Sequence, residues 1–359
     1  MRRDPAERAV EVKALYEKFT ARKFAFIFGG IVALAGLSIL ACSLGAAHIG
    51  AGEAAKAIAA RIFHLDLGVS RLAETIVWQL RLPRILTAVV AGAGLAIAGA
   101  GMQGITRNPL VSPFTVGISS AAALGAAIAI VLGASIAGPG KFFIVANAFL
   151  FAMITAFVVL GISKLRGTTA ETLILAGIAI MYIISATTSF LQYIARKEEL
   201  HALVHWMFGS LTVASWDRLL IISALTFSLI PLLLRYSWDL NAISAGDEVA
   251  RSLGVNTGRM RNMVMIFCSL ITAGIICFTG IIGFICLMSP HIARMAIGGD
   301  HRFLLPASSV VGALLLLGAD TLGRTVIAPT EIPVGIVVAF LGGPFFLYLL
   351  MTRRKEYWG

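Results

Sequence analysis

The feature that most constrains the fold of this chain is a series of long apolar stretches without a charged residue. These stretches are Phe24–Ala47, Ile85–Thr106, Phe142–Ser163, Thr172–Ala195 and Ile332–Thr352. A helix needs about 20 mostly apolar residues to cross the hydrocarbon core of a bilayer, and each stretch reaches that length. A helix in a soluble core would carry a polar stripe instead. The sequence therefore predicts an all-α polytopic membrane protein.

The composition agrees with this prediction. Hydrophobic residues make up 58% of the chain, charged residues only 13%, and the mean hydropathy is +0.91. The net charge of +11 would raise the question of nucleic acid in a soluble protein. Here the basic residues lie in short links between apolar stretches, so they indicate topology, and the expected partner is the lipid bilayer, not nucleic acid.

We expect about ten spans. The further spans are Val116–Ile136, Leu219–Leu234, Met263–Gly280, Ile281–Ala293 and Phe303–Ala319. The stretch from 262 to 293 is too long for one crossing at about 1.5 Å per residue, so we place a break near Gly280 and Gly283. This break leaves a short eighth span.

The charge distribution predicts that both termini are cytoplasmic. Most of the 29 lysine and arginine residues then fall on the cytoplasmic side, as the positive-inside rule requires. The expected organisation is a cytoplasmic amino-terminal segment at 1–23, a ten-helix domain at 24–352 and a cytoplasmic tail at 353–359. The first apolar stretch is too long for a signal-peptide core, so we expect a retained helix.

A glycine pattern in the second span predicts close helix packing. Gly99-Ala100-Gly101-Met102-Gln103-Gly104 matches the dinucleotide fingerprint G-x-G-x-x-G, but it follows no strand and lies inside an apolar stretch. Small residues recur there every fourth position, which lets helices approach closely. The predicted packing residues are Gly92, Ala96, Ala100 and Gly104.

Two kinds of site have no support in the sequence. No G-x-x-x-x-G-K-[ST] phosphate loop occurs, so if ATP drives this protein, another chain must bind it. The cysteines Cys42, Cys268, Cys277 and Cys286 lie in apolar stretches without a C-x-x-C pair. We therefore expect neither a disulfide framework nor a metal site in this chain.

Arginines on the outer side break the topological trend. Arg81 and Arg84 precede the second span at its outer end, where positive charge is not expected. They are either arginines that snorkel at a helix end or part of a surface for a partner. Asp320 and Arg324, one helical turn apart at the outer end of the ninth span, are either a local ion pair or part of the same surface.

The longest polar link on the cytoplasmic side is 238–256, and its pattern predicts two short helices. Leu240 and Ile243 would cover one apolar patch, and Val249, Leu253 and Val255 another. Gly246 and Gly254 would separate the helices. An interfacial amphipathic helix is the alternative, which the acidic pair Asp247-Glu248 disfavours at an anionic leaflet.

These residues resemble the FecCD family, the permeases of type II ABC importers for ferric siderophores, haem and cobalamin. The resemblance spans essentially the whole chain. It rests on the following motifs together: Arg81-Leu82-Pro83-Arg84, Gly99 to Gln103, Asn108-Pro109-Leu110, Gly246-Asp247-Glu248 with Ala250, Leu253 and Gly254, Gly283-Phe284, Pro290-His291 with Arg294, Asp300-His301-Arg302 with Leu305-Pro306, Gly318 with Asp320, Glu331 with Pro333 and Gly335, and Gly342-Gly343-Pro344.

The resemblance implies a role for several of these groups. Arg81, Arg84 and Arg324 would pair with acidic residues of an extracytoplasmic binding protein. The residues that would seat in the ATPase subunit are Gly246, Asp247, Glu248, Ala250, Leu253 and Gly254. Asn108 and Leu110 would form a cytoplasmic gate. A second gate turn at 167–172, where the match is loose, offers Thr168, Thr169 and Thr172.

The resemblance implies a permease subunit without its own nucleotide site, in the inner membrane of a prokaryote. Two copies, most simply a homodimer, would work with two ATP-binding subunits and a substrate-binding protein. ATP and magnesium would bind the ATPase, and this chain would bind no cofactor. The cargo would be a metal chelate, with an iron–siderophore favoured and haem or cobalamin as alternatives.

Two other functions fit the sequence less well than an importer permease does. A secondary transporter driven by an ion gradient usually places acidic residues at mid-membrane depth, and the spans here nearly lack them. An intramembrane enzyme would need a convergent catalytic set such as H-E-x-x-H or paired aspartates, which the sequence does not contain.

Overall fold

The computed structural model describes residues 5–45, 49–136, 138 and 142–352, and these form helices without a strand. Seven long helices are apolar enough to cross a membrane. They are α1 (Pro5–Ser43), α4 (Leu82–Thr106) with the turns before it, α6 (Phe143–Leu165), α7 (Ala170–Ile194), α9 (Trp216–Arg235), α12 (Thr257–Thr279) and α14 (His301–Thr325). Shorter apolar helices are α5 (Ile118–Leu132), α13 (Ile285–Ile297) and α15 (Val334–Thr352).

Each of the ten predicted spans coincides with one of these helices. The predicted break in the 262–293 stretch is confirmed: α12 ends at Thr279, and Gly280 follows with a φ of 70°. Glycine adopts this left-handed backbone without the steric cost that a Cβ would bring. The short eighth span is α13, which begins at Ile285, four residues later than predicted.

The second span begins earlier than the sequence predicted. A continuous helical segment runs through α3 (Arg71–Thr75), the π-helical turn η1 (Ile76–Arg81) and α4, which together span 36 residues. Pro83 lacks an N–H and its ring crowds the preceding turn of a regular helix. The wider π turn directly before it relieves this crowding and lets the helix continue. Arg81 and Arg84 therefore lie within a helix and not in a link.

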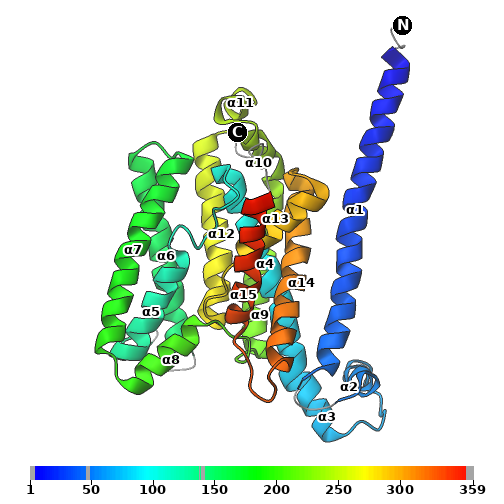
Figure 1. The fold of residues 1–359 in the computed structure, drawn as a ribbon, viewed down its shortest axis with the longest axis vertical. Helices are drawn as coiled ribbons and strands as arrows, with labels where there is room; N and C mark the ends of the chain where they lie inside the picture. Colours follow the sequence, from blue (N-terminus) through cyan, green and yellow to red (C-terminus); the bar gives the residue numbers. More distant parts are fainter. Residues whose placement is uncertain (1–4, 46–48, 137, 139–141, 353–359) are drawn as a thin grey trace.

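The short helices mark the two ends of the bundle (Figure 1). At one end lie α10 (Ser237–Ser244) and α11 (Asp247–Ser252), together with the start of α1 and the end of α15. At the other end lie α2 (Ala51–Phe63), α3 and α8 (Lys197–Met207). The start of the first helix and the end of the last thus share a side. Residues 1–4 and the predicted tail 353–359 lie outside the described residues.

Helix α4 forms the centre of the bundle and packs most extensively against α14, whereas α1 stands at the side with few buried residues (Figure 1). The packing stripe predicted from the sequence lies in this core. A methyl group at Gly92 would overlap the backbone carbonyl of Gly312, and Ala96 touches the same glycine of α14. Gly104 lies against Leu240 and His301, so the carboxyl-terminal end of the stripe meets α10 and the start of α14.

We predict that Gly92→Ala destabilises the protein, because a backbone carbonyl on α14 cannot move aside as a flexible side chain can. Overpacking of this kind costs about 1–3 kcal/mol. Gly36→Ala in α1 is the matched control, since nothing lies within 4 Å of a Cβ at Gly36. Thermal unfolding of the purified variants should show a clear decrease for Gly92→Ala alone. Equal midpoints for the two variants would contradict the close α4–α14 contact.

Candidate functional site

The polar link at 238–256 forms two short helices, as its pattern predicts. Gly246 and Gly254 separate α10 and α11 from their neighbours with φ angles of 118° and 85°. Leu240 and Ile243 of α10 are fully buried, as expected. Because α10 packs against α4 and α14, the link is fixed to the core of the bundle.

Helix α11 differs from the expectation on its outer face. Val249 and Leu253 leave 45% and 68% of their surface exposed, and only Val255 and Ala250 pack inward. Leu253 is the C-cap residue of α11, and its N–H donates to the carbonyl of Val249, so the two exposed apolar side chains lie one turn apart. The sequence pattern identified these two residues as apolar. It did not show that no other element of the described chain covers them.

The acidic pair at the start of α11 divides into one internal and one exposed residue. Asp247 accepts hydrogen bonds from Arg261 at 2.7 and 2.8 Å, one to each carboxylate oxygen. These bonds lower the pKa of Asp247 below its ordinary value. Glu248 is exposed to solvent. Asp247 therefore fixes the position of α11, while Glu248 remains available to a partner.

Helix α10 is tied to the start of α14 by side-chain contacts. The side-chain amide of Asn241 donates to Asp300 at 2.8 Å. Its amide oxygen, Oδ1, accepts from the backbone N–H of His301 at 2.8 Å. Asp300 also caps α14 and pairs with Arg302 at 2.6 Å. The Arg302 guanidinium stacks 4.1 Å from the ring of Trp238. Movement of the link must therefore act on α14.

The two predicted gate turns lie near this link. After α4, Arg107 adopts a left-handed backbone, and Asn108 accepts a hydrogen bond from the N–H of Leu110 at 2.9 Å. Leu110 is 43% exposed. In the second turn, Thr168 has a φ of 44°, and Thr169 caps α7 by accepting from the N–H of Thr172. Both turns are ordered by local capping bonds, and their gating role stays a prediction.

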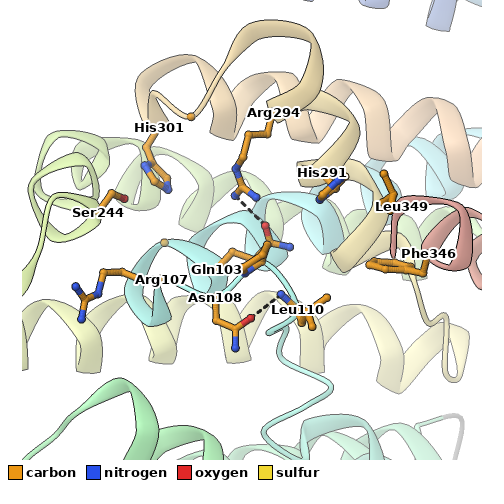
Figure 2. Close-up of a pocket in the computed structure, with 13 residues that line it drawn as sticks. Gln103, Arg107, Asn108, Leu110, Ser244, His291, Arg294, His301, Phe346 and Leu349 are labelled. Carbon is orange, nitrogen blue, oxygen red and sulfur yellow. Dashed lines mark hydrogen bonds between the residues drawn. The ribbon is translucent and has the colours of Figure 1, made fainter. Parts of the chain in front are cut away.

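A cavity of about 310 Å³ lies beside the Asn108–Leu110 turn (Figure 2). Arg294 of α13 donates to the side-chain oxygen of Gln103 at 2.9 Å in its wall. None of the described residues that line it carries a carboxylate. The lining residues are Gln103, Gly104, Arg107, Asn108, Pro109, Leu110, Ser244, His291, Arg294, Gly299, His301, Phe346 and Leu349. The cavity therefore combines the basic residues Arg107 and Arg294 with a largely apolar lining, at the end of the bundle that carries α10.

At the opposite end, two of the three predicted docking arginines are buried against the end of α1. Arg81 donates to the carbonyls of Cys42 and Ser43 at 2.6 and 3.2 Å. Arg324 donates to those of Ala41 and Leu44 at 3.4 Å each. The last four carbonyls of a helix have no partner within it, so these arginines complete the end of α1. This burial differs from the outward orientation that we expected.

Arg84, the third arginine, forms an ion-paired cluster with both acidic residues nearby. It bonds Asp320 of α14 at 3.0 Å and Glu331 at 2.7 Å. Asp320 also pairs with Arg324 at 3.1 Å, which is the local ion pair considered from the sequence. The Asp320 side chain is fully buried, whereas that of Glu331 is 40% exposed. The docking role of all three arginines stays a prediction.

The described residues hold no group of three or more His, Cys, Asp or Glu side chains arranged to bind a metal. The four cysteines are buried and unbonded to one another. The described residues therefore offer two candidate surfaces, one at each end of the bundle, and the turns at 107–110 and 167–172 lie at the same end as α11. Such an arrangement suits transport and offers no catalytic constellation among the described residues.

Comparison with known proteins places the chain in a family. A sequence model of the FecCD transport family matches residues 31–352. A protein of Methanocaldococcus jannaschii described as an ABC transporter permease is 42% identical, with 97% of this chain and 100% of the relative aligned. The hemin transport system permease protein of Yersinia pestis is 39% identical over 78% of this chain and 84% of the relative.

Two further matches agree. The cobalamin import system permease protein of Halobacterium salinarum is 40% identical over 81% of this chain and 77% of the relative. A chain from an inward-facing structure of a metal-chelate type ABC transporter superposes with a TM-score of 0.80, at 32% identity, over 91% of this chain and 99% of the other. The chain therefore belongs to the FecCD transport family of ABC importer permeases.

Proposed function

We propose that this chain is one half of the translocation unit of a binding-protein-dependent importer in the plasma membrane of a prokaryote. Two copies would enclose the pathway, two ATPase subunits would bind at the end that carries α10 and α11, and a binding protein would dock at the other end. The observation that carries the proposal is the chain's two-ended arrangement, with a protruding polar link at one end and a charged cluster at the other.

The ATPase contact rests on the exposed face of α11. Val249 and Leu253 project from a helix that Asp247 and Ala250 hold against the bundle. When a partner covers apolar side chains that are exposed to water, the burial stabilises the complex by about 25 cal/mol per Å² of apolar surface. Glu248, exposed beside them, adds a charge that would orient the partner.

The docking of the binding protein rests on Arg84. Its half-exposed partner Glu331 is a carboxylate that a second carboxylate, from the binding protein, could replace without leaving Arg84 unpaired. Arg81 and Arg324 support the same surface indirectly, because they bond the carbonyls at the end of α1 next to it. An exchange of ion-pair partners sets the orientation of docking more than its affinity.

The proposed cargo is an iron chelate, with haem and cobalamin as the alternatives. Relatives named for hemin and cobalamin transport match the chain to similar degrees, at 39% and 40% identity, so the comparisons favour neither. Importers of this type carry the metal inside its chelate, so the chain itself needs no metal ligands. The cavity beside the Asn108–Leu110 turn does not distinguish these cargoes, because its lining combines Arg107 and Arg294 with apolar side chains such as Phe346.

The proposed function predicts ATP-driven uptake. Proteoliposomes that contain this chain, its ATPase and its binding protein should accumulate labelled ferric siderophore only when ATP is enclosed with the ATPase. Hemin and labelled cobalamin serve as competing cargoes. An ionophore that collapses ion gradients should leave uptake unchanged. Uptake that needs an ion gradient and no ATP would instead support a secondary transporter.

The exposed face of α11 predicts a specific loss of ATPase binding. Leu253→Ser should weaken binding of the ATPase subunit about tenfold or more, because a buried leucine contributes on the order of 2 kcal/mol to an interface. Leu165→Ser is the matched control, since Leu165 is an exposed leucine at the end of α6. Binding is measured by surface plasmon resonance on nanodisc-embedded protein. Equal effects of the two changes would count against this contact.

The Arg84 cluster predicts opposite effects of two changes on docking. Arg84→Gln should weaken binding of the binding protein about tenfold, because a charge-assisted hydrogen bond is lost. Glu331→Gln should strengthen binding, because it removes the internal competitor for Arg84. Both affinities are measured by titration at low and high salt. A decrease for both variants would indicate a merely structural cluster.

A further inference from the structure

Arg261, near the cytoplasmic start of α12, is a buried cation with unusually distributed contacts. Only 2% of its surface is exposed. Its Nε donates to the carbonyl of Ile105 at 3.0 Å, and its Nη1 donates to the carbonyl of Thr168 at 3.4 Å. The two terminal nitrogens also bind the carboxylate of Asp247. One guanidinium thus contacts three separate segments of the chain.

Each of these three segments has a place in the proposed transport cycle. Ile105 lies in the last turn of α4, directly before the Asn108–Leu110 gate turn. Thr168 adopts a left-handed backbone in the second gate turn. Asp247 is the first residue of α11, which carries the exposed face for the ATPase. Arg261 therefore touches α11, the second gate turn and the helix end directly before the first gate turn.

The electrostatics of burial make these contacts depend on one another. A buried guanidinium is costly unless a carboxylate pairs with it and acceptors satisfy its remaining N–H groups. Asp247 is its carboxylate. If α11 moves, Arg261 must either follow Asp247 and leave the two carbonyls, or keep the carbonyls and lose its charge partner. The first result removes the hydrogen bonds to the carbonyls of Ile105 and Thr168, and the second leaves a buried guanidinium without its counter-charge, so the position of α11 and these two bonds are energetically linked.

A second contact runs in parallel. Arg107, within the first gate turn, lies 3.9 Å from the same carboxylate of Asp247, but its side chain is 43% exposed. Exposed ion pairs contribute little, typically 0–1 kcal/mol. The buried contacts of Arg261 are therefore the dominant connection between α11 and the turns. A lysine at this position would not replace them, because a single ammonium cannot present the fork of a guanidinium to all three partners.

We propose that Arg261 is a positioning residue that transmits movement of the ATPase-bound helix α11 to both cytoplasmic gate turns. This inference rests on the proposed function, because it presumes that α11 contacts an ATPase and that the turns at 107–110 and 167–172 open and close. It goes beyond that function by naming a buried side chain that links the two events. The link acts through hydrogen bonds and involves no covalent step.

The test compares Arg261→Lys with Arg259→Lys in the reconstituted complex. Arg259 lies two residues away on the same helix and is exposed, so it controls for the chemical change. Two quantities are measured: cargo molecules imported per ATP hydrolysed, and hydrogen exchange of 105–112 and 166–172 with and without a non-hydrolysable ATP analogue. A merely structural role would lower hydrolysis and uptake together, and would leave their ratio unchanged.

We expect Arg261→Lys to hydrolyse ATP within about twofold of the wild type, while import per ATP decreases at least tenfold. The nucleotide-dependent difference in exchange at both turns should disappear, whereas Arg259→Lys should behave as the wild type. An unchanged ratio, or exchange at the turns that still responds to nucleotide, would overturn the inference.

A second variant keeps the test decisive if Arg261→Lys does not assemble. Asp247→Asn removes the charge partner but leaves the carbonyl contacts of Arg261 possible, so it should lower import per ATP and reduce the exchange response. Normal coupling in Asp247→Asn would overturn the inference. Failure of the wild-type complex to import with ATP would overturn the proposed function instead, while the exchange response to nucleotide still tests whether Arg261 connects α11 to the turns.

Discussion

Buried arginines in this bundle need acceptors that only the chain can supply, and helix ends supply carbonyls that need donors. Little water reaches these positions, so an unsatisfied N–H or C=O there costs several kcal/mol. Arg81 and Arg324 complete the end of α1, and Arg261 binds a carbonyl in the last turn of α4. The same few side chains that break the hydrophobic pattern therefore join helices together, and the functional surfaces are built on these junctions.

The two ends of the molecule are connected through a rigid centre. Helix α14 begins beside the 238–256 link, where Asn241 bonds its first residue, and its other end carries Asp320 of the charge cluster with Arg84. It packs against α4 without space for a methyl group between Gly92 and Gly312. A tightly packed pair of helices moves as one body, because packed cores shift between discrete arrangements and do not stretch. This geometry suits alternating access between two faces.

The sequence predicted the helices well and the contacts poorly, for physical reasons. The length of the apolar stretches alone located the spans. Gly280 marked the break after α12, where the backbone adopts a positive φ that glycine tolerates without steric cost. The early start of the second span escaped prediction because a π turn before Pro83 has no simple pattern. Arg261 counted only as one basic residue among many. Its carbonyl partners lie 156 and 93 residues away, and local periodicity carries no information about such pairs.

The exposed face of α11 has a consequence for how the protein is made. Val249 and Leu253 lie outside the apolar helices long enough to cross a membrane and are exposed, so the chain on its own displays two uncovered apolar side chains at this end. Copies of the chain without a partner over these side chains would tend to associate with one another or be degraded. Under the proposed function, synthesis of this chain together with an ATPase subunit would keep Val249 and Leu253 covered.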